Sequence, residues 1–334
     1  MKTYNLKARI LIPLALSIVA LVGVFVFSLY WRQQKLIKNS VESTFRSVEV
    51  LFMGQLNSQY SMMGAVLDVL IEDEELKVAM KAKDRKALLD RVATIFGSWS
   101  EGHKITLLCF TSPDLVNVLR VHKPDKYGDK VNHWAILQAK NTGVTTRGFE
   151  LCALGIFTFQ VVEPWYDGGQ LIGYVELGEE IEHTTRKLHD ILGVDIYVVI
   201  EKKNLDQEAW EAEMRMLGRK ARWDQFPSAV VVYQTQDVMP EYLASFFHEE
   251  HDLSEVTEVG GLYNDRRSQT RFFSLYDASG VRVGDMVVMT DITEMARNLR
   301  HSVFIIGAIC FAVAGTLFIL FYIFIGKTEK IISR

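Results

Sequence analysis

The sequence predicts an α+β protein in which two transmembrane helices flank a long helix and two lobes built on antiparallel sheets. Two uncharged apolar runs lie near the ends of the 334-residue chain, at Ile10–Tyr30 and Val303–Ile325. An apolar stripe of helical period follows the first run, and two sets of short strand-like runs fill the region beyond the stripe. This order indicates a water-soluble region tethered to a membrane at both ends.

Each apolar run exceeds the roughly 20 residues that a helix needs to cross the hydrocarbon core. Basic residues lie outside both runs: Lys2, Lys7, Arg9, Lys327, Lys330 and Arg334. Because positive charge favours the cytoplasmic side, we expect cytoplasmic termini and a periplasmic or extracellular central region. Arg32, Lys35 and Lys38 weaken this signal. The first run is too long for a signal-peptide core and no A-x-A-like site follows it, so we expect an uncleaved anchor.

The stripe after the first run predicts a helix from Lys35 to about Met80. Its apolar residues recur mostly at intervals of three, four or seven: Val41, Phe45, Val48, Phe52, Leu56, Met63 and Leu67. Gly54 and Gly64 weaken this helix without ending it. A second helix is expected at Arg85–Phe96. Such a long helix can pack on a sheet, pair with its copy in a dimer, or carry movement into the membrane.

Five strand-like runs predict the first lobe. They are Lys104–Phe110, Leu115–His122, Thr145–Leu151, Ile156–Tyr166 and Gln170–Leu177. Turn residues such as Asp167-Gly168-Gly169 separate them. A short helix is expected between the second and third strands, at Val131–Lys140. Two strands, a helical crossing and a three-stranded meander follow the order of a PAS-like lobe. A helix expected at Glu180–Leu192 leads out.

The second lobe repeats this order of elements without visible sequence identity to the first. Its strands are expected at Asp195–Ile200, Ala229–Thr235, Thr257–Tyr263, Gln269–Tyr276 and Val281–Asp291. Its helices are expected at Leu205–Leu217 and Pro240–His251. A helix at Thr293–Arg300 then runs into the second apolar run, which gives movement of the lobe a route into the membrane.

Composition and motifs argue against several functions. A net charge of −4 without a basic stripe argues against a nucleic-acid partner. No nucleophile, haem or zinc-protease motif surrounds the histidines, so we expect no enzymatic activity, no cofactor and no bound metal. His248 and His251 could share a helix face as a weak metal site, although a solvated acidic helix end is the favoured interpretation.

Three cysteines, Cys109, Cys152 and Cys310, are too few for a disulfide framework. Cys310 lies in the second apolar run. Cys109 and Cys152 lie on expected strands, where an oxidising compartment would allow them to pair. Burial as two small core residues is the favoured alternative.

Three stretches carry a resemblance to a known family. They are LRVHKPDKYGD at Leu119–Asp129, FELCALGIFTFQVVEPWYDGGQLIGYVELGEEIEH at Phe149–His183, and WEAEMRMLGRKARWDQFP at Trp210–Pro227. The first contains the pattern RVH-x-P-x-x-x-GD. Together they resemble the extracytoplasmic double Cache (PAS-like) sensor domains of bacterial chemoreceptors, sensor histidine kinases and diguanylate cyclases, over roughly Leu36 to His301. The resemblance implies a ligand pocket in the membrane-distal lobe and an output module beyond the second span.

Strand alternation suggests where a ligand binds. Arg120 and His122 share one face of the expected second strand. A planar two-donor guanidinium with an imidazole beside it suits a carboxylate or phosphate. The loop that follows could cover the pocket, aromatic residues could form its walls, and Glu176 could bind an amine. The expected ligand-binding residues are Arg120, His122, Tyr127, Asp129, Arg147, Trp165, Tyr174 and Glu176.

Most of these residues also have a structural interpretation, and Tyr127-Gly128-Asp129 could be a turn and nothing more. Arg120 could pair with an internal carboxylate such as Glu150, Glu163 or Glu176, because structural ion pairs imitate binding sites. His122 could cap a turn, or sense pH as the stimulus. For Arg147 and the aromatic residues the structural role is favoured.

The hypothesis is a signal-transduction sensor that spans a bacterial inner membrane twice and acts as a homodimer. It binds a small organic acid or amino-acid-like ligand. Binding then shifts a helix, and this shift passes to a cytoplasmic module or partner. The expected segments are a cytoplasmic N-terminus (1–9), transmembrane helix 1 (10–30), long and second helices (31–99), a membrane-distal lobe (100–192), a membrane-proximal lobe (193–302), transmembrane helix 2 (303–325) and a short cytoplasmic tail (326–334). A truncated chain, a split gene and a stand-alone sensor all fit so short a tail. A membrane adaptor that binds another protein is the alternative function, and a periplasmic enzyme is the less favoured one.

Overall fold

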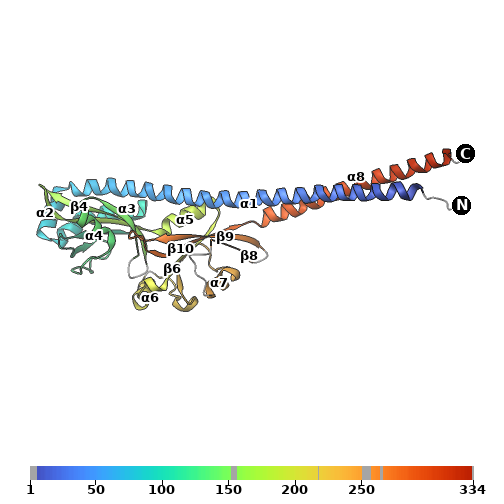
Figure 1. The fold of residues 1–334 in the computed structure, drawn as a ribbon. Coiled ribbons are helices and arrows are strands. Elements are labelled where there is room, and N and C mark those ends of the chain that lie inside the picture. The colour runs from blue at the N-terminus through green and yellow to red at the C-terminus, as the bar shows by residue number, and fades with distance from the viewer. Residues whose placement is uncertain (1–5, 152–155, 217, 250–256, 264–265, 333–334) are drawn as a thin grey trace. The chain divides into compact units, whose positions relative to one another are not determined.

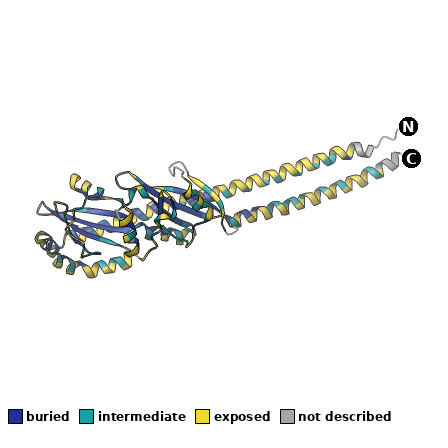
Figure 2. Cartoon of the chain, turned by 90° about the horizontal axis from the view of Figure 1, so that it is seen from below, coloured by how far each residue is buried: buried dark blue, intermediate teal, exposed yellow. Residues whose placement is uncertain are grey.

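The computed structural model describes residues 6–151, 156–216, 218–249, 257–263 and 266–332. Over these residues it contains two five-stranded antiparallel sheets together with helices of very different length, which confirms the predicted α+β class (Figure 1). We call the two sheets with their covering helices the first lobe and the second lobe. Buried residues gather on the strands, whereas the apolar segments near the two ends of the chain are mostly exposed (Figure 2).

The predicted N-terminal apolar run and the long helix form one continuous helix, α1 (Leu6–Ile71). The predicted C-terminal helix and the second apolar run also form one helix, α8 (Thr293–Ile332). Both contain a segment long and apolar enough to cross a membrane. In the most apolar window of each, 6% and 0% of the residues are buried. This exposure differs from that of a core helix in a soluble protein and agrees with lipid as the surrounding medium.

The expected helix to Met80 is wrong in its last part, because α1 ends at Ile71 and a separate helix, α2 (Glu74–Ala82), follows. The Asp73 carboxylate accepts a hydrogen bond from the Leu76 N–H at 3.0 Å, which caps α2 and fixes the break. Helix α3 (Arg85–His103) is longer than expected. It ends where Lys104 adopts a left-handed backbone with φ of 60°, so the strand expected from Lys104 begins only at Leu107.

The first lobe has the strand order β2-β1-β5-β4-β3. Its elements are β1 (Leu107–Thr111), β2 (Asn117–Arg120), α4 (Trp134–Thr142), β3 (Thr146–Leu151), β4 (Phe157–Asp167) and β5 (Gln170–Glu180). They follow the order that the sequence predicts, with two strands, a helix and a meander. Helix α5 (Ile181–Leu192) leads from this lobe to the second.

Helix α1 covers one face of the first sheet. Phe52 stacks on Phe149 with ring centres 6.2 Å apart, and Tyr60 meets Phe159 edge to face at 5.7 Å. The indole of Trp165 donates a hydrogen bond to the Ile71 carbonyl at 2.8 Å, which ties the last turn of α1 to β4. Aromatic pairs of this kind add about 0.5–1.5 kcal/mol each beyond burial of their area. The opposite face of the sheet is therefore left to α4 and to the loop that precedes it.

The second lobe has the strand order β7-β6-β10-β9-β8. Its elements are β6 (Asp195–Glu201), η1 (Lys202–Asn204), α6 (Gln207–Met216), η2 (Trp223–Gln225), β7 (Ala229–Gln234), α7 (Glu241–His248), β8 (Glu258–Tyr263), β9 (Arg266–Tyr276) and β10 (Arg282–Asp291). Its core includes Tyr197, Phe226, Phe247 and Val287. The His248 ring lies 5.2 Å from that of Phe226, while the other half of the candidate metal pair, His251, is outside the described residues. Cys152 also falls outside them, whereas Cys109 is a buried free thiol.

Candidate functional site

Strand register places a row of polar residues on the face of the first sheet that α1 does not cover. Arg120 pairs with Cys109, and Cys109 pairs with Glu176. Farther along the sheet, Thr158 on β4 pairs with Glu150 on β3. Directly paired residues point to the same side of a sheet, and Glu176 also pairs with Val162, which lies four residues after Thr158 on β4, so all these side chains share one face.

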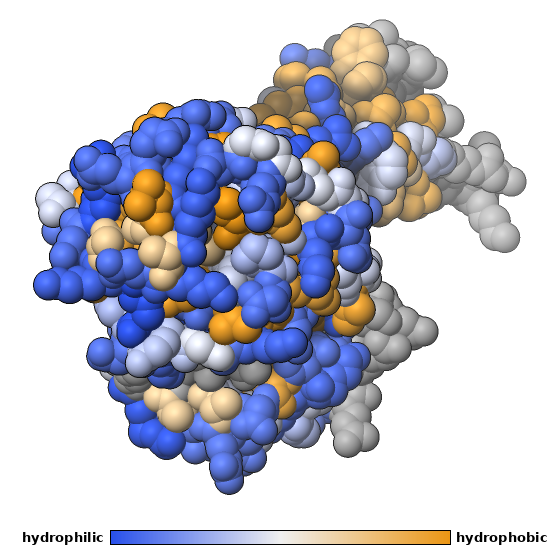
Figure 3. Space-filling view, turned by 90° about the vertical axis from the view of Figure 1, so that its left-hand side faces the viewer, coloured by the Kyte–Doolittle hydropathy of each residue, from blue (hydrophilic) through white to orange (hydrophobic). Residues whose placement is uncertain are grey.

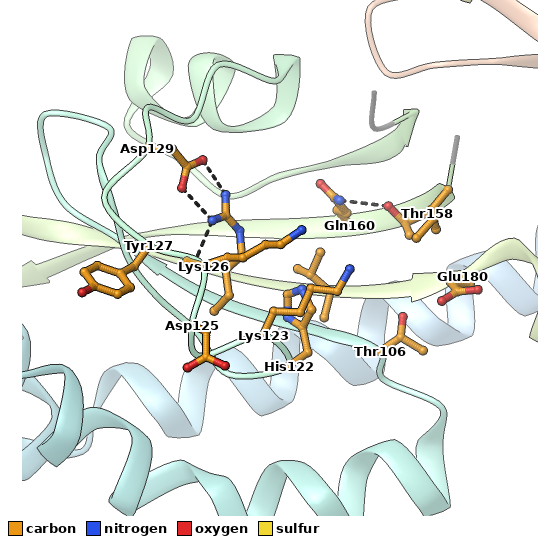
Figure 4. Close-up of a pocket in the computed structure, with 13 residues that line it drawn as sticks. Thr106, His122, Lys123, Asp125, Lys126, Tyr127, Asp129, Thr158, Gln160 and Glu180 are labelled. Carbon is orange, nitrogen blue, oxygen red and sulfur yellow. Dashed lines mark hydrogen bonds and ion pairs between the residues drawn. The ribbon is translucent and has the colours of Figure 1, made fainter. Parts of the chain in front are cut away.

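A cavity of about 690 Å³ opens on this face (Figure 4). That volume lies within the range typical of small-molecule sites, roughly 300–1,000 Å³. The loop that follows β2 forms one wall, and β4 contributes the polar floor. The lining residues are Thr106, Leu107, Arg120, His122, Lys123, Asp125, Lys126, Tyr127, Asp129, Ile156, Thr158, Gln160 and Glu180.

Arg120 is held by a two-pronged ion pair with Asp129. Its Nη1 and Nη2 donate to the two Asp129 carboxylate oxygens at 2.7 Å each, and Nη1 also donates to the Lys126 carbonyl at 3.1 Å. The hydrogen bonds to Asp129 raise the pKa of Arg120, and the same bonds lower the pKa of Asp129. The loop is thereby fastened to the end of β2, with a fixed cation and a fixed anion at the cavity wall.

A second arginine supports the same loop from outside. The Arg85 guanidinium on α3 lies 3.3 Å from the centre of the Tyr127 ring and donates to the Pro124 carbonyl at 2.5 Å. Stacking of a guanidinium on an aromatic face is a favourable cation–π contact. Helix α3 therefore holds the cavity loop through a second arginine, in addition to Arg120 on β2.

His122 presents a neutral imidazole to the cavity. Burial, and then the nearby Lys123 charge, lower the pKa of His122 to about 4. Its Nδ1 is buried and makes no hydrogen bond with the described residues. A buried nitrogen without a partner costs free energy, and a ligand group that bonds to it would recover that cost.

The floor of the cavity carries a second such atom. Gln160 is 4% exposed, and its amide nitrogen donates to the Thr158 hydroxyl at 2.9 Å. Its carbonyl Oε1 is buried and has no partner among the described groups. This oxygen can accept a hydrogen bond, so it suits an amine, amide or hydroxyl of a ligand.

Glu176 lies on the cavity side of the sheet but beside α4 rather than in the cavity lining. Its Oε2 is 3.1 Å from Nε2 of His133. The Glu150 carboxylate lies 3.6 Å from Nδ1 of the same ring and accepts a hydrogen bond from the Ala135 N–H at 2.7 Å. Burial disfavours the charged imidazole, but the two carboxylates outweigh it and raise the pKa of His133 to about 10. The three residues form an ion cluster at the start of α4.

The other expected site residues lie away from the cavity. Tyr174 is buried in the apolar cluster beneath α4, with Ile136 and Ala139. Arg147 and Trp165 lie on the opposite face, where the Arg147 guanidinium is 5.2 Å from the Tyr60 ring and Trp165 bonds to Ile71. Of the eight expected residues, the structure brings four together around the cavity, Arg120, His122, Tyr127 and Asp129.

Several lining residues were not among the expected ones. Thr158 and Gln160 are polar residues two positions apart in the otherwise apolar first half of β4 (residues 157–162), a pattern that indicates a buried polar row. Thr106 and Glu180 lie outside any such pattern.

The charges of the residues that line the cavity balance, because three cations (Arg120, Lys123 and Lys126) accompany three anions (Asp125, Asp129 and Glu180).

Two antiparallel lobes in tandem, the first with a polar cavity on one face of its sheet, define the class of double sensory domains. The chain belongs to the double Cache family. Residues 38–225 match the family model described as the double sensory domain of two-component sensor kinases. The comparison with curated proteins finds no match.

Solved structures with a similar chain course come from bacterial sensory proteins. A domain of a protein assigned to the sensory box/GGDEF family of Vibrio parahaemolyticus is 14% identical, with a TM-score of 0.46, covering 78% of this chain and 99% of that one. The ligand-binding domain of the Campylobacter jejuni chemoreceptor Tlp3, in complex with 4-methylisoleucine, is 10% identical, with a TM-score of 0.43 and coverage of 80% and 94%. The sensor domain of the V. cholerae histidine kinase DctB is 11% identical, with a TM-score of 0.43 and coverage of 77% and 98%.

Proposed function

We propose that this chain is a two-span membrane sensor whose first-lobe cavity binds a small, amino-acid-like ligand. The observation that carries the proposal is the cavity wall itself, which includes both the Arg120 guanidinium and His122 with its buried, unpartnered Nδ1. Arg120 supplies the charge for a ligand carboxylate. Asp129 and the unpartnered Gln160 oxygen supply acceptors for an ammonium group. No catalytic step is part of the proposal.

The long helices provide the route for a signal. Helix α1 contacts the first sheet through Phe52 and Tyr60 and continues without a break into the N-terminal apolar segment. A change in the sheet on ligand binding would shift α1, and helix shifts of roughly 1–2 Å are typical of such transitions. The ligand must bind the two states unequally for any shift to occur.

The proposed arrangement in the cell follows from the two apolar helices. Both termini face the cytoplasm, the double Cache region is periplasmic, and the chain acts as a homodimer on a cytoplasmic signalling module or partner. The first lobe is the membrane-distal one. Basic residues outside each span support this orientation.

A thermal-shift screen of the full chain in detergent tests the proposal. Amino acids, organic acids and amines are compared, and a ligand at 100 times its Kd stabilises the folded state by about 2.7 kcal/mol. We expect a hit that Arg120→Ala abolishes and that the matched control Arg147→Ala retains, because Arg147 lies on the opposite face. A hit that survives in Arg120→Ala would contradict the cavity assignment.

One observation favours an adaptor as the second candidate. Apolar residues on α1 remain exposed beside the lobes, among them Val50 at 64%, Met53 at 52% and Val69 at 72%. Such residues can pair with a second copy or with another protein. A chain that captures a partner through this helix, and that no small molecule stabilises, would support the adaptor instead.

A further inference from the structure

The second lobe has a cavity of its own, of about 730 Å³. Three segments enclose it, namely the first turns of α5, residues 219–225, and strand β7 with the loop after it. Its lining residues are Glu182, Arg186, Arg219, Lys220, Arg222, Gln225, Val231, Val232, Tyr233, Gln234, Asp237 and Val238. None of them lines the first-lobe cavity.

Charge distinguishes this cavity from the first one. Its lining contains four cations (Arg186, Arg219, Lys220 and Arg222) against two anions (Glu182 and Asp237). A concave surface with an excess of one charge concentrates ligands of the opposite charge. The cavity therefore favours an anion, whereas the first-lobe cavity is balanced.

The four cations differ in whether they form ion pairs within the chain. Arg186 donates to Glu182 at 2.7 Å, and Arg219 donates to Glu180 at 3.0 Å and also pairs with Glu182. Lys220 and Arg222, by contrast, form no ion pair with any residue in the described part of the chain. Gln225 and Gln234 add amide donors to the same lining. Two unpaired cations beside neutral donors form a suitable set for a small oxyanion.

We propose that the second-lobe cavity is a separate site for a small oxyanion, a carboxylate or a phosphate, bound chiefly by Lys220 and Arg222. Arg219 completes the site from its edge. Its guanidinium bridges the two cavities, because its partner Glu180 lines the first-lobe cavity. An anion that draws Arg219 away from Glu180 would alter the charge balance of the first cavity, and binding at the two sites would be coupled reciprocally. Only this coupling rests on the proposed function.

Calorimetric titration of the full chain in uncharged detergent tests the site. Inorganic phosphate and succinate are titrated separately at constant ionic strength, with chloride as the reference anion. We expect saturable binding of at least one of the two, and the stronger one identifies the preferred oxyanion. In the double variant Lys220→Gln/Arg222→Gln the Kd should rise at least tenfold. The matched control, Lys203→Gln/Arg215→Gln, removes two exposed cations of the same lobe that do not line the cavity and should leave the Kd unchanged.

Three results would overturn the proposal. They are the absence of saturable binding of either anion, an unchanged Kd in the Lys220/Arg222 variant, and an equal loss in the control variant. Arg120→Ala separates this site from the first-lobe cavity. If Arg120→Ala abolishes anion binding while the Lys220/Arg222 variant retains it, the anion binds in the first lobe. The second site would then be wrong and the proposed function would stand.

Discussion

Arg120 and Asp129 lie nine residues apart and meet through two parallel hydrogen bonds of 2.7 Å at the wall of the first-lobe cavity. This geometry fixes both charges, since a planar guanidinium and a carboxylate match each other in two places. The Arg120 side chain is 22% exposed and that of Asp129 is 52% exposed, so the pair faces the cavity rather than the core. A bound zwitterion would find an anchored cation and an anchored anion side by side.

Asp129→Asn should therefore change ligand preference more than it changes stability. An exposed ion pair contributes about 0–1 kcal/mol, so the melting temperature should fall by only a few degrees. We expect affinity for an amino acid to fall at least tenfold relative to the matching acid without the amine, because the anion that faces the ammonium is lost. Titration calorimetry on wild type and variant gives the ratio of the affinity for the amino acid to that for the matching acid. If this ratio is the same in both proteins, Asp129 only positions Arg120.

The His133 cluster should make stability fall in alkaline solution. The pKa of His133 is raised to about 10 from an ordinary value of 6.5, so the folded state holds this proton more tightly. The stabilising contribution is complete below pH 6.5 and is lost as pH rises towards 10. Denaturant unfolding at a series of pH values measures the slope of the free energy of unfolding against pH.

His133→Gln should remove that slope and lower stability near neutral pH. Glu150 and Glu176 would share the start of α4 without a cation, and breaking a buried ion cluster in this way costs about 3–5 kcal/mol. His103→Gln, at the exposed end of α3, is the control and should change neither quantity. A slope that persists in His133→Gln would assign it to another group.

Glu179 should contribute a second, lower pH transition. It is 1% exposed on the face of β5 that α1 covers, and its Oε2 has no partner among the described residues. Burial raises the pKa of Glu179 to about 8, although the Lys187 charge opposes this shift. Because the folded state favours the protonated form, its contribution is present below about pH 4.5 and is lost as pH rises through 8.

Glu179→Gln mimics the protonated acid and should flatten stability between about pH 5 and 8. At pH 8 and above the variant should be more stable than wild type by a few kcal/mol, since one unit of pKa shift corresponds to about 1.4 kcal/mol. The exposed Glu208 supplies the control Glu208→Gln. Equal pH profiles for wild type and Glu179→Gln would show that the carboxylate ionises without cost.

The elements with strong alternation could be predicted from the sequence almost to the residue. Strand β3 was expected at Thr145–Leu151 and spans Thr146–Leu151. The errors arise where one side chain or one backbone angle decides a boundary. The Asp73 cap divides two helical stretches that share an apolar pattern, and the left-handed Lys104 determines the end of α3. Neither the Asp73 cap nor the Lys104 backbone angle changes the apolar periodicity from which helices are predicted.

The cavity could be predicted only in part, for a related reason. Arg120, His122, Tyr127 and Asp129 belong to one strand end and its loop, so local alternation suffices to group them. Arg147 lies on a different strand, and its face depends on register, which pairs it with Val161 on the α1 side. A shift of one residue in register would reverse that face. Sequence alone does not provide this register, whereas the polar pair Thr158 and Gln160 could have been recognised.

Two glycines should respond to alanine in opposite directions. Gly284 on β10 pairs with Ile200, and a methyl group there would lie 2.0 Å from the Val199 carbonyl oxygen. Gly284→Ala must displace a central strand and should cost about 3 kcal/mol or more, as overpacking of a rigid core does. Gly64 on α1 has nothing within 4 Å of the added atom. Gly64→Ala should stabilise the protein by about 1 kcal/mol through helix propensity. Thermal unfolding of both variants beside wild type measures the two shifts, and a stabilising Gly284→Ala would show that β6 and β10 are not packed as described.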